Sequence, residues 1–448
     1  MDILSFFACF ETLVTSTARR QLAVIAQAML TLTGRLTMLS LSRWTEKGGS
    51  YRTINRFFAT RLNWTELLVK FFETHLFNPD NEYILAGDET VVSKSGTETF
   101  GIDRFFSGLQ SRVIKGLSFF VISLVNVRQR TSYPLTVKQT IRSEAEKEAV
   151  RERKKKFAGQ SKKRKSKPKG RKKGSFNKNR EQLNLSPELL RINGLLAVLV
   201  KLVRVFVRVE YIALDGHFGH HQAVLMAREN RLHLISKLRK DAAVYEKCEG
   251  AYSGRGARKK YGGKLDYNKL PLKYLKKSER EGDILTRFYQ GIFLSKRFGS
   301  QLNVVIIEKI NLKTEKVGHA ILFSSDGELN AEKLVEYYSL RFQIEFNFRD
   351  AKQHFGLEDF MNTTEVGVEN AANMAFLMVN VSAKLLQKSD GKGVGINDLK
   401  SHFRGVKYAL ETIKLVQPKA ECILIEKVKQ AISRMGSIHR HNFYASSA

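Results

Sequence analysis

The chain has 448 residues, and its 76 Lys and Arg against 44 Asp and Glu give a formal net charge of +32. A share of 43% apolar residues is enough for a hydrophobic core, which excludes a wholly disordered polycation. The three cysteines lie far apart, which argues against a disulfide framework and against a thiolate zinc site. So large a positive charge favours a polyanionic partner.

No segment has the pattern of a targeting signal or a membrane span. The chain begins with an acidic residue, Asp2, where a signal peptide has positive charge. The longest apolar runs, 116–127 and 195–214, are too short to cross a bilayer or are interrupted by charged side chains. We therefore expect a cytoplasmic protein without a membrane partner.

Residues 1–78 show the apolar spacing of helices and are predicted to form a helical region. Arg52 and Arg56 lie four residues apart, which puts them on one face of a predicted helix. Asn63 and Glu66 have the spacing of a capping box at the start of another helix. A small helical module with one basic face fits a DNA-binding region. An ordinary helical bundle with a solvated basic face fits these residues equally well.

From residue 79 the pattern changes to short apolar runs that alternate with helical segments. The predicted strands are 83–88, 116–127, 131–137, 209–215 and 232–238, and the predicted helices are 187–203 and 220–230. Strands that alternate with helices predict an α/β fold, and we place this domain at residues 79–390.

A basic run at about 147–182 interrupts this domain. Between Arg151 and Arg180 there are 16 basic residues and one acid, with almost no apolar side chains, so we predict a loop. A nucleic-acid clamp, a ribosome-like tail and a solvated spacer are all compatible with this composition. The position within the α/β domain favours the clamp, whose contacts with the DNA backbone would include Lys163, Arg164 and Arg171.

Two further regions follow the α/β pattern. Residues of about 240–318 contain clustered glycines and strand-like runs, so we expect an all-β insertion within the domain. Helices are predicted at 331–355 and 367–387, and the second is apolar nearly all round and therefore buried. Residues 391–448 are predicted to form a helical carboxyl-terminal region.

Two acids, Asp88 and Asp215, each follow a short apolar run. The carboxyl ends of strands in an open α/β sheet are where ligands bind, so two neighbouring strand ends would aim two carboxylates at one place. Each acid taken alone is also compatible with a polar residue that merely ends a strand.

The predicted helix at 331–355 carries a third acid. At about 100° per residue from Tyr338, the side chains of Arg341, Glu345 and Lys352 fall near 300°, 340° and 320°, on one stripe beside the apolar face. The helix could thus present Glu345 at the edge of the core, between two cations. An ion-paired surface helix explains the same spacing, because Arg341 and Glu345 are four residues apart.

Three converging carboxylates are suited to hard cations. Two ions of Mg²⁺ or Mn²⁺ held by oxygen ligands can activate a water or hydroxyl and stabilise the oxygen that leaves phosphorus. Nearby Arg and Lys side chains could then bind phosphates.

The segment Tyr338-Ser-Leu-Arg341-Phe-Gln-Ile-Glu345-Phe-Asn-Phe-Arg-Asp-Ala-Lys352 matches a Y-x2-R-x3-E-x6-K signature. Together with the two upstream aspartates, it resembles the bacterial insertion-sequence transposases of the DDE superfamily that carry this signature and move by cut-and-paste. The resemblance covers about residues 80–390.

This resemblance implies a ribonuclease H-like catalytic domain that cleaves DNA and transfers strands by a two-metal mechanism. It implies that Asp88, Asp215 and Glu345 are the catalytic metal ligands, and that Tyr338, Arg341 and Lys352 contact DNA. The implied partners are double-stranded DNA, as transposon terminal inverted repeats and target, and a second copy of the chain, held through the carboxyl-terminal region. A bacterial, nucleoid-associated protein is the implied setting.

Two other functions compete with this one. A transposase-derived regulator would bind DNA without cutting it, and metal-dependent nicking of a DNA end would discriminate between the two. An RNA-binding or ribosome-associated protein would explain the charge, but it would leave the stripe of Arg341, Glu345 and Lys352 unexplained.

Overall fold

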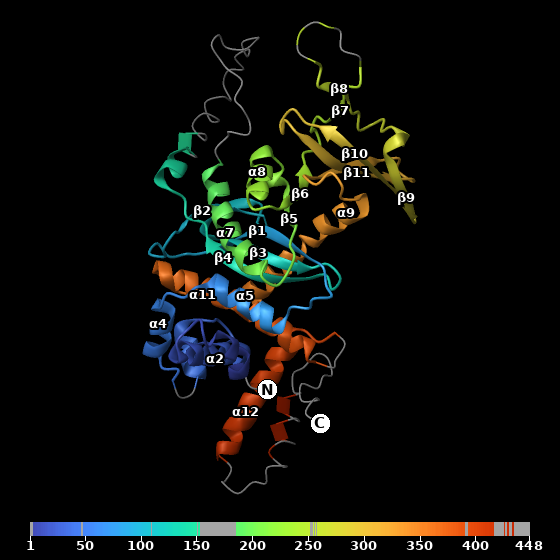
Figure 1. Ribbon diagram of the computed structural model, residues 1–448. Helices are drawn as coiled ribbons and strands as arrows, with labels where there is room; N and C mark the ends of the chain where they lie inside the picture. The colour runs from blue at the N-terminus through green and yellow to red at the C-terminus, as the bar shows by residue number, and fades with distance from the viewer. Residues whose placement is uncertain are drawn as a thin grey trace.

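A mixed β-sheet lies at the centre of the molecule, with helices on both of its faces (Figure 1). The computed structural model describes residues 3–415 apart from 46–47, 109, 150, 153–184, 251–253, 255, 257 and 390–392, together with residues 425, 428–429 and 432–433. The expected α/β class is confirmed.

The described strands form one sheet of twelve. They are β1 (Tyr83–Ser93), β2 (Asp103–Ser107), β3 (Arg112–Asn126), β4 (Thr131–Gln139), β5 (Tyr211–Leu214), β6 (His233–Leu238), β7 (Tyr245–Lys247), β8 (Tyr261–Lys264), β9 (Leu275–Glu281), β10 (Ile284–Leu294), β11 (Gln301–Asn311) and β12 (Val317–Ser324). Their order is β2-β3-β1-β5-β6-β12-β11-β10-β7-β8, with β4 paired to β3 and β9 to β10.

The strand directions change at β1. This strand is antiparallel to β3, which is antiparallel to β4, whereas β1, β5 and β6 are parallel. The strands from residue 245 onward are antiparallel and continue the same sheet, because β12 pairs with β6. The β-rich segment at 240–318 therefore extends the central sheet.

The described helices and 3-10 turns cover this sheet and extend below it. They are α1 (Ile3–Phe6), η1 (Phe7–Phe10), α2 (Ser16–Thr31), α3 (Met38–Trp44), α4 (Tyr51–Ala59), α5 (Trp64–His75), α7 (Pro187–Val203), η3 (Gly216–Phe218), α8 (His221–Glu229), η4 (Leu272–Tyr274), α9 (Ala331–Leu340), α10 (Gln343–Gln353), α11 (Glu365–Gln387) and α12 (Ile396–Leu415). None of the described helices combines the length and the hydrophobicity that a membrane span requires.

Local signals explain several helix starts. The hydroxyl of Ser50 accepts a hydrogen bond from the Thr53 amide at the start of α4, and Ser186 caps α7, with Pro187 at its first position. The capping box predicted at Asn63 is wrong: α5 begins there, but the Asn63 side chain makes no capping hydrogen bond. The Asn63 backbone, at φ −84° and ψ 80°, lies outside the extended conformation usual for an N-cap residue.

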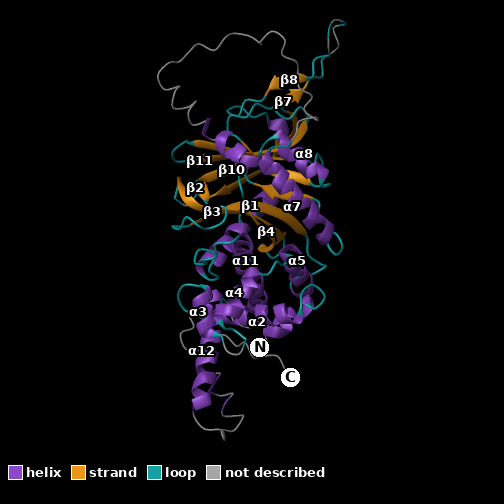
Figure 2. Ribbon diagram, turned by 90° about the vertical axis from the view of Figure 1, so that its left-hand side faces the viewer, coloured by secondary structure: helices purple, strands orange, loops and turns teal. Residues whose placement is uncertain are grey.

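The helices form two layers on the central strands. Helices α7 and α8 lie on one face, and α5, α10 and α11 lie on the other (Figure 1 and Figure 2). Helix α11 is buried along nearly its whole length, as its apolar sequence predicted. It lies between the sheet and the amino-terminal helix α4, and it packs beside α5.

One hydrophobic core joins the amino-terminal helices to the sheet. The cluster runs from Ile3 through Phe72 and Tyr133 to Phe403. A smaller cluster lies under α9, where Tyr337 and Leu340 pack on the side chains of β1 and its neighbours. The sheet is thus fixed from both faces, which gives the side chains that project from β1 and β5 a rigid base.

Candidate active site

Asp88 lies within strand β1, five residues before its end. The prediction that this aspartate ends a strand is wrong, because β1 continues to Ser93 by pairing with β3. Its other partner, β5, is shorter, and their parallel register ends at Gly87 and Leu214. Asp88 therefore stands where one neighbouring strand stops, and its side chain is free to leave the sheet there.

Asp215 comes directly after β5, as predicted, and follows Leu214 in register with Gly87. Asp88 and Asp215 are therefore the first residues beyond the paired part of two adjacent parallel strands. The Asp215 side chain caps the short η3 turn by accepting a hydrogen bond from the His217 amide at 3.0 Å. The hydroxyl of Ser236 on β6 donates to the Asp215 carbonyl at 2.7 Å, which fixes the backbone at this point.

Glu345 lies in the first turn of α10, a helix that packs on β1 and β4. The prediction of one continuous helix from 331 to 355 is wrong, because α9 ends at Leu340 and α10 begins at Gln343. At the break, the amides of Arg341, Phe342, Ile344 and Glu345 bond to carbonyls three residues back. Such tight turns rotate each side chain further than an α-helix does, so the predicted stripe is only approximate.

Asp215 and Glu345 act electrostatically on Asp88. Burial raises the pKa of Asp88 to about 6, although the Arg341 guanidinium and the Glu89 amide act in the opposite direction. Asp215 and Glu345 both add to the rise in this pKa. Their negative charges therefore act on Asp88 from the residue after β5 and from α10.

Arg341 is the cation nearest to this group. Its guanidinium forms an ion pair with Asp88, and both side chains are mostly buried, with 17% and 18% of their surface exposed. The same guanidinium lies 5.8 Å from the ring centre of Tyr338. The Arg341 Nε is buried and has no hydrogen-bond partner among the described residues. A buried donor of this kind is available to an incoming acceptor.

Lys352 lies near the end of α10 and reaches the same strand as Asp88. Its Nζ donates to the Val91 carbonyl at 2.8 Å, and burial lowers the pKa of the ammonium group. The next contribution to this pKa comes from Glu358, which raises it. Arg341 and Lys352 thus contact β1 at Asp88 and at Val91.

Two acids near the site were not predicted. Glu188 in the first turn of α7 accepts from His217 Nε2 at 3.2 Å, a contact that lowers the pKa of Glu188 and raises that of His217. Glu89, next to Asp88, accepts a short hydrogen bond from Ser118 on β3. Neither acid belongs to a spacing motif. Only the position of Glu89 beside Asp88 could have pointed to it.

The donors suit a hard divalent cation by their chemistry, because all three are carboxylates and their mutual repulsion would be relieved by positive charge. Among the described residues, however, no three acidic, histidine or cysteine side chains lie close enough to hold one ion. Arg341 pairs with one Asp88 oxygen, so this carboxylate already has a positively charged partner. A metal would have to displace that contact.

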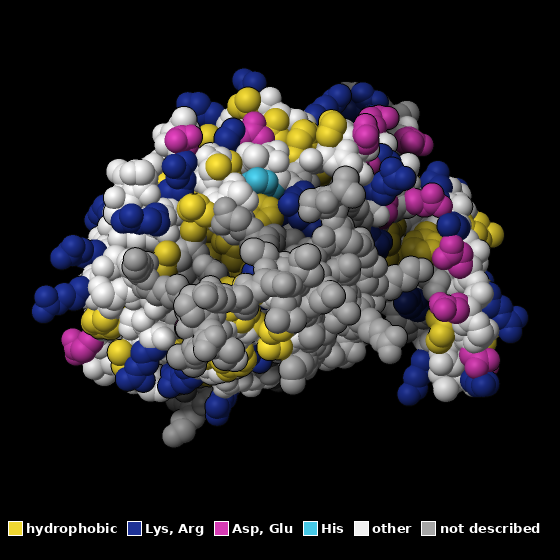
Figure 3. Space-filling model, turned by 90° about the horizontal axis from the view of Figure 1, so that it is seen from below, with side chains coloured by type: hydrophobic (Ala, Val, Ile, Leu, Met, Phe, Trp, Pro, Cys, Tyr) yellow, Lys and Arg dark blue, Asp and Glu magenta, His cyan; other side chains and the backbone are white. Residues whose placement is uncertain are grey.

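The other predicted DNA contacts lie elsewhere. Arg52 and Arg56 are exposed on α4, which α11 separates from the sheet (Figure 1). Lys163, Arg164 and Arg171 lie outside the described residues. Figure 3 shows Lys and Arg side chains spread round the face seen from below, so positive charge is distributed over this side of the folded body.

Two known families match long segments of the chain. Residues 5–283, more than half of the chain, match a family described as DDE superfamily endonuclease. The chain belongs to this superfamily. Residues 191–381, which include Asp215 and Glu345, match a second family, described as Transposase DDE domain. The protein is therefore a DDE transposase, a nuclease that acts on DNA, and its family uses divalent metal ions. No curated protein matches the chain.

Proposed function

We propose that Asp88, Asp215 and Glu345 are the catalytic carboxylates of this transposase. The observation that carries the proposal is the β1–β5 register, which ends at Gly87 and Leu214, one residue before Asp88 and Asp215. The charge of Glu345 on α10 also contributes to the raised pKa of Asp88. Mg²⁺ or Mn²⁺, as two ions, would supply Lewis acidity and an activated water or hydroxyl for in-line displacement at phosphorus.

The chain's own cations would hold the DNA. Arg341, with its unpartnered Nε, can exchange the Asp88 carboxylate for a phosphate in a bidentate contact. Lys352 can leave the Val91 carbonyl for a phosphate oxygen as a point charge. The Tyr338 ring beside Arg341 would restrict the guanidinium to one side. These three residues would align the scissile phosphate with the carboxylates.

The strand order also bears on the fold family of the catalytic domain. The strand order β4-β3-β1-β5-β6, with antiparallel strands before β1 and parallel strands after it, supports a ribonuclease H-like core. We also propose that the chain belongs to the transposases with the Y-x2-R-x3-E-x6-K signature. Its catalytic domain would span residues 79–390, between helical end regions, and residues of about 240–318 would be a β insertion in that domain. Recognition of insertion-sequence ends and of target DNA, and a dimer formed on that DNA, also belong to it.

The test is metal-dependent nicking of the DNA that flanks the coding region, with the new 3′-hydroxyl ends mapped. Removal of a side chain that supports a metal ligand lowers activity about 10- to 100-fold. Asp88→Asn, Asp215→Asn and Glu345→Gln each change a proposed ligand itself, so each should lower the cleavage rate by more than about 100-fold. DNA binding should remain.

Glu336→Gln, on α9, is the matched control and should cleave as the wild type does. Wild-type cleavage by Asp88→Asn, Asp215→Asn or Glu345→Gln would remove that residue from the mechanism. A wild-type chain that binds these ends but never nicks them would instead be a DNA-binding regulator.

A further inference from the structure

The β2–β3 hairpin has an unusual exposed face. Phe106 and Val113 stand opposite each other in the antiparallel register, with 63% and 51% of their surfaces exposed. The pair two positions along, Arg104 and Lys115, is also exposed. Side chains opposite each other in antiparallel strands share a face, so two apolar groups and two cations lie together.

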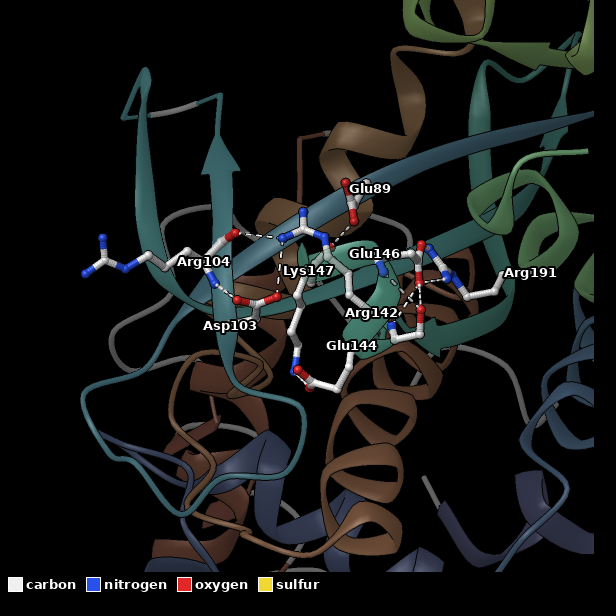
Figure 4. A network of polar contacts seen from close by, with 10 residues as sticks. Glu89, Asp103, Arg104, Arg142, Glu144, Glu146, Lys147 and Arg191 are labelled. Carbon is white, nitrogen blue, oxygen red and sulfur yellow. Dashed lines mark hydrogen bonds and ion pairs between the residues drawn. The ribbon is translucent and has the colours of Figure 1, made fainter. Parts of the chain in front are cut away.

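The other face of the hairpin is anchored to the body. The Phe105 ring is buried, and the Arg142 guanidinium lies 4.4 Å above its centre. Arg142 Nη1 donates to the Arg104 carbonyl at 2.9 Å and contacts the Asp103 carboxylate at 3.4 Å. In Figure 4 the Arg104 side chain points away from this network.

This anchoring also neutralises the one negative charge of the hairpin. Asp103 is the one acid between residues 103 and 116, and it is paired with Arg142. Arg104, Arg112 and Lys115 are the three cations of the same stretch. The hairpin is therefore a fixed, positively charged ribbon, and its exposed apolar pair is not covered by the described parts of the chain.

The exposed face belongs to the side of the sheet that carries Asp88. Strand side chains alternate, so Val113 and Lys115 share a face with Val121, which is the register partner of Asp88. Asn347 of α10 contacts Ser123 on this same face. Val113 lies eight residues from Val121, which is roughly 25 Å along the strand.

We propose that the β2–β3 hairpin is a second DNA-contact element, which lies against duplex DNA on one side of the active site. Arg104 and Lys115 contact phosphates, and Phe106 with Val113 contacts the groove, which is wide enough for a two-stranded ribbon. A duplex that runs from Asp88 along this face reaches the hairpin after about seven base pairs. The inference rests on DNA as the substrate, but it requires neither a bound metal nor the proposed catalytic carboxylates.

A photocrosslink tests the contact directly. The full chain with benzoylphenylalanine in place of Phe106 is irradiated with a labelled 40-base-pair duplex of the flanking DNA. We expect a protein–DNA adduct, and a much weaker one when the same group replaces the exposed Val205 beyond α7. Failure to form an adduct at position 106, or an adduct with a second copy of the chain, would overturn the proposal.

Salt dependence of binding to the same duplex gives a second readout. Loss of two phosphate contacts in Arg104→Ala/Lys115→Ala should reduce the magnitude of the negative slope of log K against log salt by about 1.8. Phe106→Ala should weaken binding and leave the slope unchanged, because an apolar contact releases no counterions. The control Lys201→Ala/Arg228→Ala changes two exposed cations on α7 and α8, the helices of the opposite face.

An unchanged slope in the Arg104→Ala/Lys115→Ala variant, or an equal decrease in the control, would contradict the hairpin contact. Neither binding measurement depends on cleavage. A wild-type chain that cleaves DNA but shows no hairpin effect would therefore refute this inference and leave the proposed function intact. If the hairpin substitutions change DNA binding as expected but the wild-type chain never nicks DNA, the hairpin contact stands and the proposed function is refuted.

Discussion

Asp88 is kept in a position that is unfavourable for a charged side chain. Its side chain is mostly buried on strand β1, this burial raises its pKa to about 6, and two other carboxylates contribute to the rise. Arg341 compensates for only part of the burial. Groups with such perturbed pKa values concentrate at functional sites, where stability is exchanged for activity.

The raised pKa of Asp88 predicts a specific pH dependence of stability. The folded state binds the proton more tightly than the unfolded state, whose pKa is 3.8, so ionisation of Asp88 destabilises the fold as pH rises from about 4 to 6. Between pH 5 and pH 8 the wild type should therefore lose about 1 kcal/mol more unfolding free energy than Asp88→Asn. Urea denaturation of both proteins at the two pH values measures this difference, and equal losses would show that the Asp88 carboxylate is not destabilised by folding.

At the scale of elements, the pattern of apolar residues predicted most helices and strands but not how they end. Helix α7 has its predicted bounds, and the strand expected at 116–127 is the buried part of β3. The extent of β1 could not be predicted, because pairing with β3 carries it past Asp88. The break between α9 and α10 was missed because no Gly or Pro marks it.

The candidate site was predicted in a similar, partial way. Asp215 and Glu345 were selected by strand end and helix spacing, and these are local signals. The ion pair of Arg341 with Asp88 joins residues 253 positions apart in the sequence. The contact of Glu188 with His217 depends on how α7 packs beside η3. Such contacts follow from tertiary packing, which a single sequence does not reveal.

Helix α11 is joined to the amino-terminal helices by one buried amide. Asn370 accepts a hydrogen bond from Trp64 Nε1 at 2.6 Å and donates to the carbonyls of Phe58 and Thr60 at 2.8 and 2.7 Å. Asn370→Ala leaves these groups buried without partners and should lower the unfolding free energy by about 3 kcal/mol.

A neighbouring substitution is the control for this prediction. Glu369→Ala removes an exposed ion pair with Lys138 and should cost less than about 1 kcal/mol. Urea denaturation of both variants compares the two costs. Equal costs would mean that the Asn370 contacts do not hold the two regions together.

At the scale of the whole molecule, the amino-terminal helices and the sheet share one core. Phe72 of α5 packs against Tyr83 of β1 and Tyr133 of β4, with ring centres 5.8 and 5.3 Å apart. The change of sequence pattern near residue 79 predicted a boundary, but it could not show that the two sides pack together. The described amino-terminal helices are therefore fixed against the sheet through this core.

The shared core predicts that the catalytic region is unstable alone. A chain that lacks residues 1–78 exposes the apolar surfaces of α11 and β4, so it should aggregate or bind a hydrophobic dye. The full chain under the same conditions should do neither. A soluble truncated protein with a cooperative thermal transition would show instead that residues 79–448 fold independently.

Our central proposal is that Asp88, Asp215 and Glu345 together hold divalent ions once Arg341 has left Asp88. Fe²⁺ substituted for Mg²⁺, with hydrogen peroxide and ascorbate added, generates hydroxyl radicals that cut the polypeptide beside the metal ligands. The fragments can be sized with the DNA bound. We expect cuts near residues 88, 215 and 345, all of which disappear in Asp88→Asn. Cuts at unrelated positions, or none near these three residues, would contradict it.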